Sequence, residues 1–216
     1  NYILTKTFEE NISYHEALKQ AQEKGFAESN HDLDTKGFDA KYKLLLLLAH
    51  AFGIVSKPHE IFNAGIDRIG KIELNYAREK NLKIKLIAHA FKTGNGNVSC
   101  FVMPKFIDSH NKLYHVDDVY NGVITKTSFA DIQFFVGKGA GAHPTASAVL
   151  SDISTLSYDY RYEYKKLHQL EKATLSNDVL LKVFCRHKTG EAEYLEEYFE
   201  CVDETFSNNH SGYIIG

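Results

Sequence analysis

The sequence is poor in cysteine and has no paired metal-ligand spacing. Its three cysteines, Cys100, Cys185 and Cys201, are odd in number and widely separated. This pattern suits a reducing cytoplasm and argues against a disulfide framework or a zinc site. The 11 histidines are scattered singly, without a His-Glu-x-x-His pair, so we expect no metal ligands among them.

Long apolar runs and blocks of basic residues are also missing. No apolar run approaches the roughly 20 residues that a membrane-spanning helix needs. The net charge of -3, without a cluster of lysine and arginine, disfavours nucleic acid or an anionic membrane as the main partner. The 216 residues, 44% of them hydrophobic, suffice for one large domain or two small ones. The chain opens at Asn1 without an initiator methionine, which suggests a fragment of a longer protein.

A polar stretch at residues 28–43 runs into an apolar helix. Residues 40–52 are rich in good helix formers, and no proline occurs before Pro58. Asp39 and Lys43 are therefore neighbours one helical turn apart. Because five leucines follow Lys43, we expect part of its side chain to be buried, and a buried ammonium needs anionic partners. The nearest candidates in sequence are Glu28, Asp34 and Asp39.

Two interpretations of this stretch are open. A lysine held by carboxylates can give or take a proton, which would make the stretch a catalytic site. Alternatively, the acidic residues occupy the positive end of a helix dipole, and Lys43 extends along the helix to reach solvent. Spacing alone favours the second interpretation, because acidic first turns are common in helices.

The order of helix and strand patterns indicates the fold class. Apolar residues at three- and four-residue spacing predict helices over most of residues 1–25, then at 40–52 and 71–80. A loop is expected at 26–36, and a short strand with a connecting loop at 54–70. Alternating residues and turn signals predict strands at 83–91, 98–106, 120–127 and 131–136, the first two as a hairpin. Helices followed by antiparallel strands predict an α+β fold, with helices packed on one face of a mainly antiparallel or mixed sheet.

A glycine cluster at residues 137–141 precedes Pro144. Glycine lets the backbone approach a ligand closely, and residues 144–154 are expected to form a helix with proline in its first turn. The N–H groups there could bind an anion or the carboxamide edge of a cofactor. A tight connection between a strand and a helix explains the same glycines equally well.

The remainder of the chain, residues 157–216, is rich in tyrosine and charge. We expect an exposed linker at 157–177 and a small β-α-β appendage after it. Its predicted elements are a strand at 179–187, a helix at 191–199 and a final strand at 213–215. Cys185, His187 and Cys201 are expected to be packing residues.

Several motifs in order resemble the homoserine dehydrogenase family over about residues 1–155. They are AsnTyrIleLeu at 1–4, GlyPheAlaGlu at 25–28, the pattern of Asp34, Gly37, Asp39 and Lys43, IleLysLeuIleAla at 84–88, TyrAsnGly at 120–122, and ProThrAlaSerAlaVal at 144–149. The chain departs from the family at Asn30 and His31, where Asp-Pro is frequent, and at Lys138, where proline or alanine is frequent. We expect these departures to alter loop stiffness and not chemistry.

The resemblance implies a domain organisation and a reaction. A Rossmann-type nucleotide-binding domain would precede this region and bind most of the cofactor, NADP or NAD. Residues 1–156 would be the catalytic, substrate-binding and dimerisation domain of a cytoplasmic homodimer. The implied reaction interconverts L-homoserine and L-aspartate 4-semialdehyde, on the route to threonine, methionine and isoleucine. Without the nucleotide-binding domain, we expect the fragment to be inactive.

The resemblance also implies roles for individual residues. Lys43 would donate and accept the proton at the substrate oxygen, and Glu28 would bind the substrate amino group. Asp34 and Asp39 would orient the substrate and the lysine. The cofactor's nicotinamide side would lie against Gly139 and Gly141, and Thr145 would begin the adjoining helix.

The alternative is a noncatalytic α+β domain whose acidic loop and tyrosine-rich tail bind a partner protein. Convergence of the four charged residues near Gly139 would favour the enzyme. Side chains pointing apart into solvent would favour the interaction domain.

Overall fold

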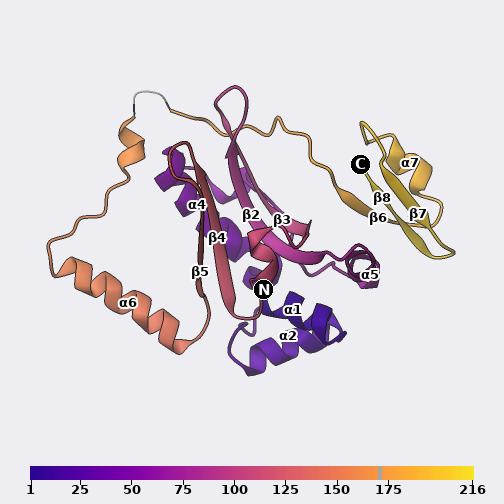
Figure 1. Ribbon diagram of the computed structural model, residues 1–216, viewed down its shortest axis with the longest axis horizontal. Helices are drawn as coiled ribbons and strands as arrows, with labels where there is room; N and C mark the ends of the chain where they lie inside the picture. Colours follow the sequence, from indigo (N-terminus) through magenta and orange to yellow (C-terminus); the bar gives the residue numbers. More distant parts are fainter. Residues whose placement is uncertain (170–171) are drawn as a thin grey trace. The chain divides into compact units, whose positions relative to one another are not determined.

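A three-stranded sheet organises the first part of the chain (Figure 1). In the computed structural model, which describes residues 1–169 and 172–216, its strands are β1 (Phe62–Asn63), β2 (Lys83–Lys92) and β3 (Val98–Ile107). They lie in the order β1-β3-β2, with β1 parallel and β2 antiparallel to β3. The predicted hairpin is confirmed, and the register pairs Ala88 with Val102.

The helices before and between these strands follow the predicted pattern with one addition. They are α1 (Tyr2–Glu9), α2 (Tyr14–Glu23), α3 (Asp32–Thr35), α4 (Phe38–Phe52) and α5 (Lys71–Glu79), with a 3-10 turn η1 at Pro58–Glu60. Ser13 caps α2 by accepting the N–H of Glu16 at 3.2 Å. The prediction of a loop over 26–36 is wrong in its second half, where α3 forms. The backbone N–H of Thr35 bonds to the His31 carbonyl at 2.8 Å and closes the turn that forms α3.

The expected packing of helices on one sheet face is confirmed. Leu44 and Leu48 of α4 pack against Val98, Cys100 and Val102 of β3. A second cluster joins α1, α2 and α5 to the same face near Ile84. Because side chains alternate along a strand, the facing residues of β2 and β3 form one apolar layer under the helices.

The five consecutive leucines of α4 do not all enter this core. Leu44 and Leu48 are buried, whereas Leu46 and Leu47 are 57% and 49% exposed. Successive residues of an α-helix turn by about 100°, so a run of five must pass around to the solvent side. The helix therefore buries some of these leucines and exposes others, although the run is uniformly apolar in sequence.

A separate hairpin and a long helix come next in the chain. After the 3-10 turn η2 (Lys112–His115), β4 (Tyr120–Thr127) pairs antiparallel with β5 (Asp131–Lys138), which confirms the two predicted strands. The helix α6 (Ala142–Leu156) begins two residues before Pro144 and has no buried residue. No helix in the described ranges is long and apolar enough to cross a membrane.

The segment after α6 is not the fully exposed linker that we expected. It contains a 3-10 turn, η3 (Lys165–His168), and then joins the edge of β3. Val98 donates its N–H to the Thr174 carbonyl and accepts the N–H of Ser176, each at 2.9 Å. Leu175 packs against the α4 core. Residues 170 and 171 of the expected linker lie outside the described residues. Compact units are found at residues 1–176 and 177–216, and the expected boundary at 156/157 stays a prediction.

The second unit is an antiparallel three-stranded sheet with one short helix. Its elements are β6 (Phe184–Lys188), α7 (Ala192–Glu196), β7 (Glu204–Ser207) and β8 (Ser211–Ile215), in the strand order β6-β8-β7. The expected β-α-β arrangement is wrong, because the unit contains a further strand, β7. The strand expected at 179–187 begins only at Phe184. Tyr213 stacks on Phe184 and Phe206, with ring centroids 4.6 and 5.4 Å away. These aromatic contacts fix β8 between its neighbours.

Candidate active site

The predicted proton-transfer pair lies on the first turns of α4. Lys43 Nζ is 2.7 Å from Asp39 Oδ2, and their side chains are 61% and 51% exposed. The expected burial of the Lys43 stem is therefore wrong. Leu44 and Leu48 face the sheet, whereas Lys43 lies on the solvent side of the helix. The lysine is held by a carboxylate, as expected, but it is open to solvent in this chain.

The buried lysine of α4 is Lys41. It is 5% exposed, its Nζ donates a hydrogen bond to Asn63 Oδ1, and it lies 5.0 Å from the centroid of the Phe38 ring. Burial lowers the pKa of Lys41 below its ordinary value. Two residues correspond to about 200° around a helix, so Lys41 and Lys43 face opposite ways. The leucine run indicated a buried lysine on α4, but the buried lysine is Lys41 and not Lys43.

Glu28 and Asp34 are linked through the backbone of the acidic loop. The Glu28 N–H donates to Asp34 Oδ2 at 3.4 Å, and the Glu28 carbonyl accepts Gln22 Nε2 at 3.0 Å. Both acidic residues are exposed, with Asp34 on the short helix α3. This arrangement leaves the Glu28 carboxylate available to a ligand while its backbone is held.

The four charged residues predicted for the site form two separate pairs. Lys43 pairs with Asp39 on α4 at 2.7 Å, and the Glu28 N–H donates to Asp34 Oδ2 at 3.4 Å. Among the described residues, no hydrogen bond or ion pair joins one pair to the other. The expected convergence of the four side chains near Gly139 therefore stays a prediction.

The glycine cluster closely approaches a side chain of β4. A Cβ placed at Gly139 would lie only 1.8 Å from Asn121 Nδ2, so no larger residue fits there without displacing Asn121. The Gly139 N–H donates to the Val119 carbonyl at 3.1 Å. Gly141 has φ +114°, a conformation that L side chains rarely adopt, and α6 begins at the next residue. The expected contact of this backbone with a cofactor stays a prediction.

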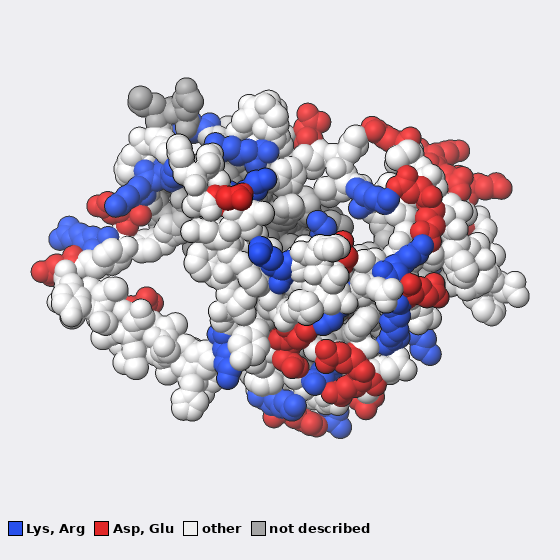
Figure 2. Space-filling model, viewed as in Figure 1, with Lys and Arg blue, Asp and Glu red and all other residues white. Residues whose placement is uncertain are grey.

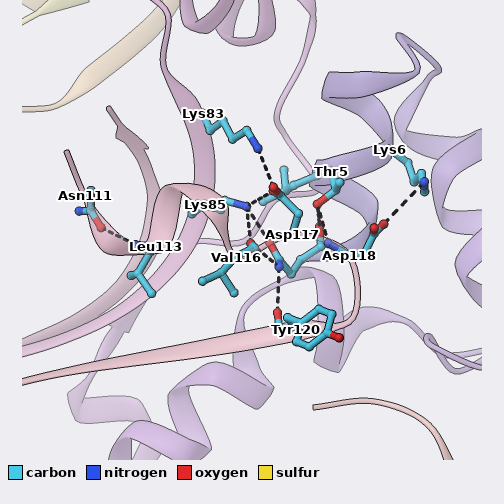
Figure 3. Close-up of polar contacts among 12 residues, drawn as sticks. Thr5, Lys6, Lys83, Lys85, Asn111, Leu113, Val116, Asp117, Asp118 and Tyr120 are labelled. Atoms are coloured by element: carbon cyan, nitrogen blue, oxygen red, sulfur yellow. Dashed lines mark hydrogen bonds and ion pairs between the residues drawn. The ribbon is translucent and has the colours of Figure 1, made fainter. Parts of the chain in front are cut away.

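A polar network that the sequence analysis missed joins β2 to the turn at Asp117 (Figure 3). Lys85 Nζ is 2.6 Å from Asp117 Oδ1, and Lys83 Nζ is 2.7 Å from Asp117 Oδ2. Burial lowers the pKa of Lys85, while its hydrogen bond to Asp117 opposes that shift. Burial would raise the pKa of Asp117, but the two lysines hold it below its ordinary value.

One sequence signal could have revealed this network. Lys83 and Lys85 are placed two residues apart in an otherwise apolar strand, so they share one sheet face. Two lysines on the same face of a half-buried strand require an acidic partner elsewhere in the chain. That partner, Asp117, is distant in sequence, and only the fold identifies it.

Charge and tyrosine packing bear on the choice between enzyme and interaction domain. Both signs of charge are interspersed over the face drawn in Figure 2. The tyrosine-rich segment is partly folded, since Tyr162 and Tyr164 lie 5.1 and 4.7 Å from the His50 ring of α4. In the described part of the chain, no group of three or more His, Cys, Asp or Glu side chains could hold a metal ion. All four predicted charged side chains are exposed, and the choice between enzyme and interaction domain rests on the comparison with known proteins.

Comparison with known proteins gives the same family for most of the chain. A sequence model described as homoserine dehydrogenase matches residues 1–154. The homoserine dehydrogenase of Helicobacter pylori is 40% identical over 153 residues, which cover 71% of this chain and 36% of that protein. The enzyme of Lactococcus lactis is 35% identical over 215 residues, covering 95% of this chain and 50% of that protein. The chain thus spans between about a third and a half of these relatives.

Solved structures extend the similarity over the whole chain. A homoserine dehydrogenase from Thiobacillus denitrificans matches with a TM-score of 0.81 and 25% identity, covering 100% of this chain and 54% of that one. A hyperthermophilic archaeal homoserine dehydrogenase in complex with NADPH matches with a TM-score of 0.58 and 27% identity, over 74% of this chain and 44% of that one. The α+β fold therefore agrees with this family of structures.

Proposed function

Because this chain belongs to the homoserine dehydrogenase family, we propose that it forms the substrate-binding and catalytic part of an enzyme interconverting L-homoserine and L-aspartate 4-semialdehyde. The observation that carries the proposal is the ion pair of Lys43 with Asp39, 2.7 Å long and more than half exposed, within the region that matches the family. A lysine held by a carboxylate and open to solvent can reach a bound substrate. A reaction that moves a proton at a substrate oxygen does need such a group.

Lys43 is proposed to move the proton. When the semialdehyde is reduced, its carbonyl oxygen takes a proton from the Lys43 ammonium and becomes the hydroxyl of homoserine. When homoserine is oxidised, the hydroxyl proton returns to the Lys43 amine. Asp39, 2.7 Å away, keeps the lysine side chain directed to one place. The exposure of both side chains leaves room for a substrate to reach them.

Glu28 is proposed to bind the ammonium group of the amino-acid substrate. Its carboxylate is exposed, and its backbone is fixed by Asp34 Oδ2 and Gln22 Nε2. A carboxylate paired with an ammonium forms a charge-assisted hydrogen bond, which orients the substrate as well as binding it. Asp34 holds this loop in place and is proposed to orient the substrate.

Gly139 and Gly141 are proposed to lie against the nicotinamide of NADP or NAD. The absence of space for a Cβ at Gly139 and the positive φ of Gly141 support this role. When bound, the cofactor supplies or accepts the hydride at the carbon that carries the substrate oxygen. Thr145 begins the adjoining helix turn, where its Oγ1 donates to the Gly141 carbonyl at 2.9 Å and steadies the glycine segment.

The wider setting of the enzyme is also a proposal. We place the protein in the cytoplasm, as a homodimer acting in threonine, methionine and isoleucine biosynthesis, without nucleic acid or membrane as partners. The cofactor would be bound mainly by a nucleotide-binding domain outside these 216 residues. For that reason, we expect the chain alone to be inactive.

The test is to assay the full-length enzyme that contains this region. Purified enzyme should reduce NAD or NADP when L-homoserine is added, followed as absorbance of the reduced cofactor. L-serine, one carbon shorter, serves as the control substrate and should react far more slowly. Absence of homoserine-dependent reduction with either cofactor would overturn the proposal.

A further inference from the structure

Lys85 is a buried lysine whose contacts reach the turn at Val116 and Asp117 (Figure 3) and also Asn1. Its side chain is 8% exposed, and its Nζ donates to Asp117 Oδ1 and to the Val116 carbonyl, both at 2.6 Å. A third contact, at 3.4 Å, reaches Asn1 Oδ1. A lysine ammonium has three donors, so all three are used. An ammonium group bound in this way holds its acceptors in place and is not a mobile acid or base.

Asn1 binds the same turn that Lys85 binds. Its Nδ2 donates to the Val116 carbonyl at 2.8 Å and to the Tyr120 carbonyl at 2.9 Å. The next helical turn adds a further contact, because Thr5 Oγ1 accepts the Asp118 N–H at 3.1 Å. Asp118 has φ 53°, which a non-glycine residue adopts only where its surroundings hold it. The turn at residues 116–120 is thus shaped by contacts from outside it.

This turn also holds the glycine cluster. The Val119 carbonyl accepts the Gly139 N–H, and Asn121 fills the space beside Gly139. A displacement at Lys85 would therefore move the glycine cluster, which is the proposed cofactor site.

We infer that Lys85 is a positioning residue for the proposed reaction: with Asn1 and Asp117 it holds the turn at residues 116–120, and through this turn it holds the glycine cluster. This inference rests on the proposed function. An apolar residue would fill the same volume without the cost of burying a charge, but it would leave the Val116 carbonyl and Asn1 Oδ1 without this donor. The ammonium is suited to holding three acceptors at fixed positions.

The first experiment compares Lys85→Met and Lys83→Met in the full-length enzyme. Lys83 shares Asp117 but contacts neither Asn1 nor Val116, so it is a matched control for loss of charge at Asp117. Lys85→Met should lower kcat on the order of 10- to 100-fold, because misplacement by about 1 Å is costly even far from the reacting atoms. The KM for homoserine should change little, since Glu28 is untouched. Lys83→Met should stay near the wild type.

A kinetic isotope effect separates positioning from general damage. With homoserine deuterated at the carbon that carries the hydroxyl, the primary isotope effect on kcat should rise in Lys85→Met, because hydride transfer becomes slower relative to product release. Loss of active enzyme through misfolding would lower the rate without raising this isotope effect. Asn1 is solvent-exposed, and Asn1→Ala removes its hydrogen bonds to the Val116 and Tyr120 carbonyls. This substitution should therefore reproduce both the lower kcat and the larger isotope effect.

The second experiment needs no activity and uses the 216-residue chain. Hydrogen exchange should speed up at the Asp118 and Gly139 amides in Lys85→Met and Asn1→Ala, but not in Lys83→Met. Wild-type kcat and isotope effect in an active full-length enzyme, together with unchanged exchange in both variants, would overturn the inference. If the wild-type enzyme does not oxidise homoserine, the proposed function fails instead, while the exchange data still decide whether Lys85 holds the turn.

Discussion

Lys43 and Asp39 form an ion pair of 2.7 Å on the solvent side of α4, one turn apart and both more than half exposed. An exposed pair of this kind contributes about 1 kcal/mol or less to stability, and salt screens it further. The same chain offers a near twin in Lys36 and Asp32, also 2.7 Å apart and half exposed. The two pairs differ in their proposed roles, since only Lys43 is proposed to move the substrate proton.

This difference allows a matched test of Lys43. In the full-length enzyme, Lys43→Ala should lower kcat on the order of 10²- to 10⁴-fold, the usual contribution of a proton-transfer group. Lys36→Ala should leave kcat near the wild-type value. Cofactor binding, measured by fluorescence titration, should be unchanged in both. Near-normal turnover of Lys43→Ala would contradict its assignment.

Glu28 is tested by separating KM from kcat. Glu28→Gln keeps the shape of the side chain but loses the charge that would pair with the substrate ammonium. A hydrogen bond to a charged group contributes about 1.5–3 kcal/mol, so the KM for homoserine should rise on the order of 10- to 100-fold. Glu23→Gln, an exposed change at the end of α2, is the control. An unchanged KM in Glu28→Gln would count against substrate binding by this residue.

The glycine cluster offers two alanine substitutions with opposite expected outcomes. A Cβ at Gly139 would overlap Asn121 Nδ2, whereas a Cβ at Gly137 meets no atom within 4 Å. Gly139→Ala should therefore displace the Asn121 side chain and weaken cofactor binding about tenfold, which corresponds to 1.4 kcal/mol. Gly137→Ala should bind cofactor normally. Equal dissociation constants for the two variants would show that Gly139 does not shape the cofactor site.

The leucine run of α4 predicts a contrast in stability. Leu48 is fully buried and Leu47 is 49% exposed, on the same helix. Leu48→Ala should lower the free energy of unfolding by about 2–5 kcal/mol. Leu47→Ala should change it by less than about 0.5 kcal/mol. Both substitutions replace leucine by alanine within α4, so their effects on helix propensity cancel. The difference between their unfolding free energies, measured in urea, therefore reports burial alone. Similar losses from the two substitutions would mean that α4 packs differently.

Asp117 predicts a pH dependence of stability. Its pKa in the folded protein is held below the ordinary value by Lys83 and Lys85. A depressed carboxylate pKa stabilises the fold at pH values above the unfolded pKa, about 3.9, and this stabilisation is lost as the pH falls through the folded pKa. The wild type should exceed Asp117→Asn in unfolding free energy at pH 7, and the difference should narrow at about pH 3.

The control for this prediction is Asp152→Asn, an exposed substitution on α6. It should show no comparable narrowing between the two pH values. A constant difference between wild type and Asp117→Asn from pH 7 to pH 3 would mean that the two lysines do not stabilise the charged carboxylate.

Most elements of the fold could be predicted because their signals are local. Alternation and the Gly-Asn-Gly-Asn turn were enough for the hairpin of β2 and β3, whose backbone pairs across a short loop. Residues 173–176 and β7 were missed because they pair with strands that are distant in sequence or too short to show a period. Local patterns do not carry information about such pairing.

The sequence by itself determined the family, the order of helices and strands, and the identity of Glu28, Asp34, Asp39 and Lys43 as candidates, because each of these is a pattern of residue types at fixed spacing. Only the tertiary structure decided which lysine is buried, since the side of α4 that meets the sheet selects Lys41 and leaves Lys43 in solvent. It also decided that Lys85, Asn1 and Asp117 meet, because a buried charge needs partners and those of Lys85 come from two segments that are distant from it in sequence.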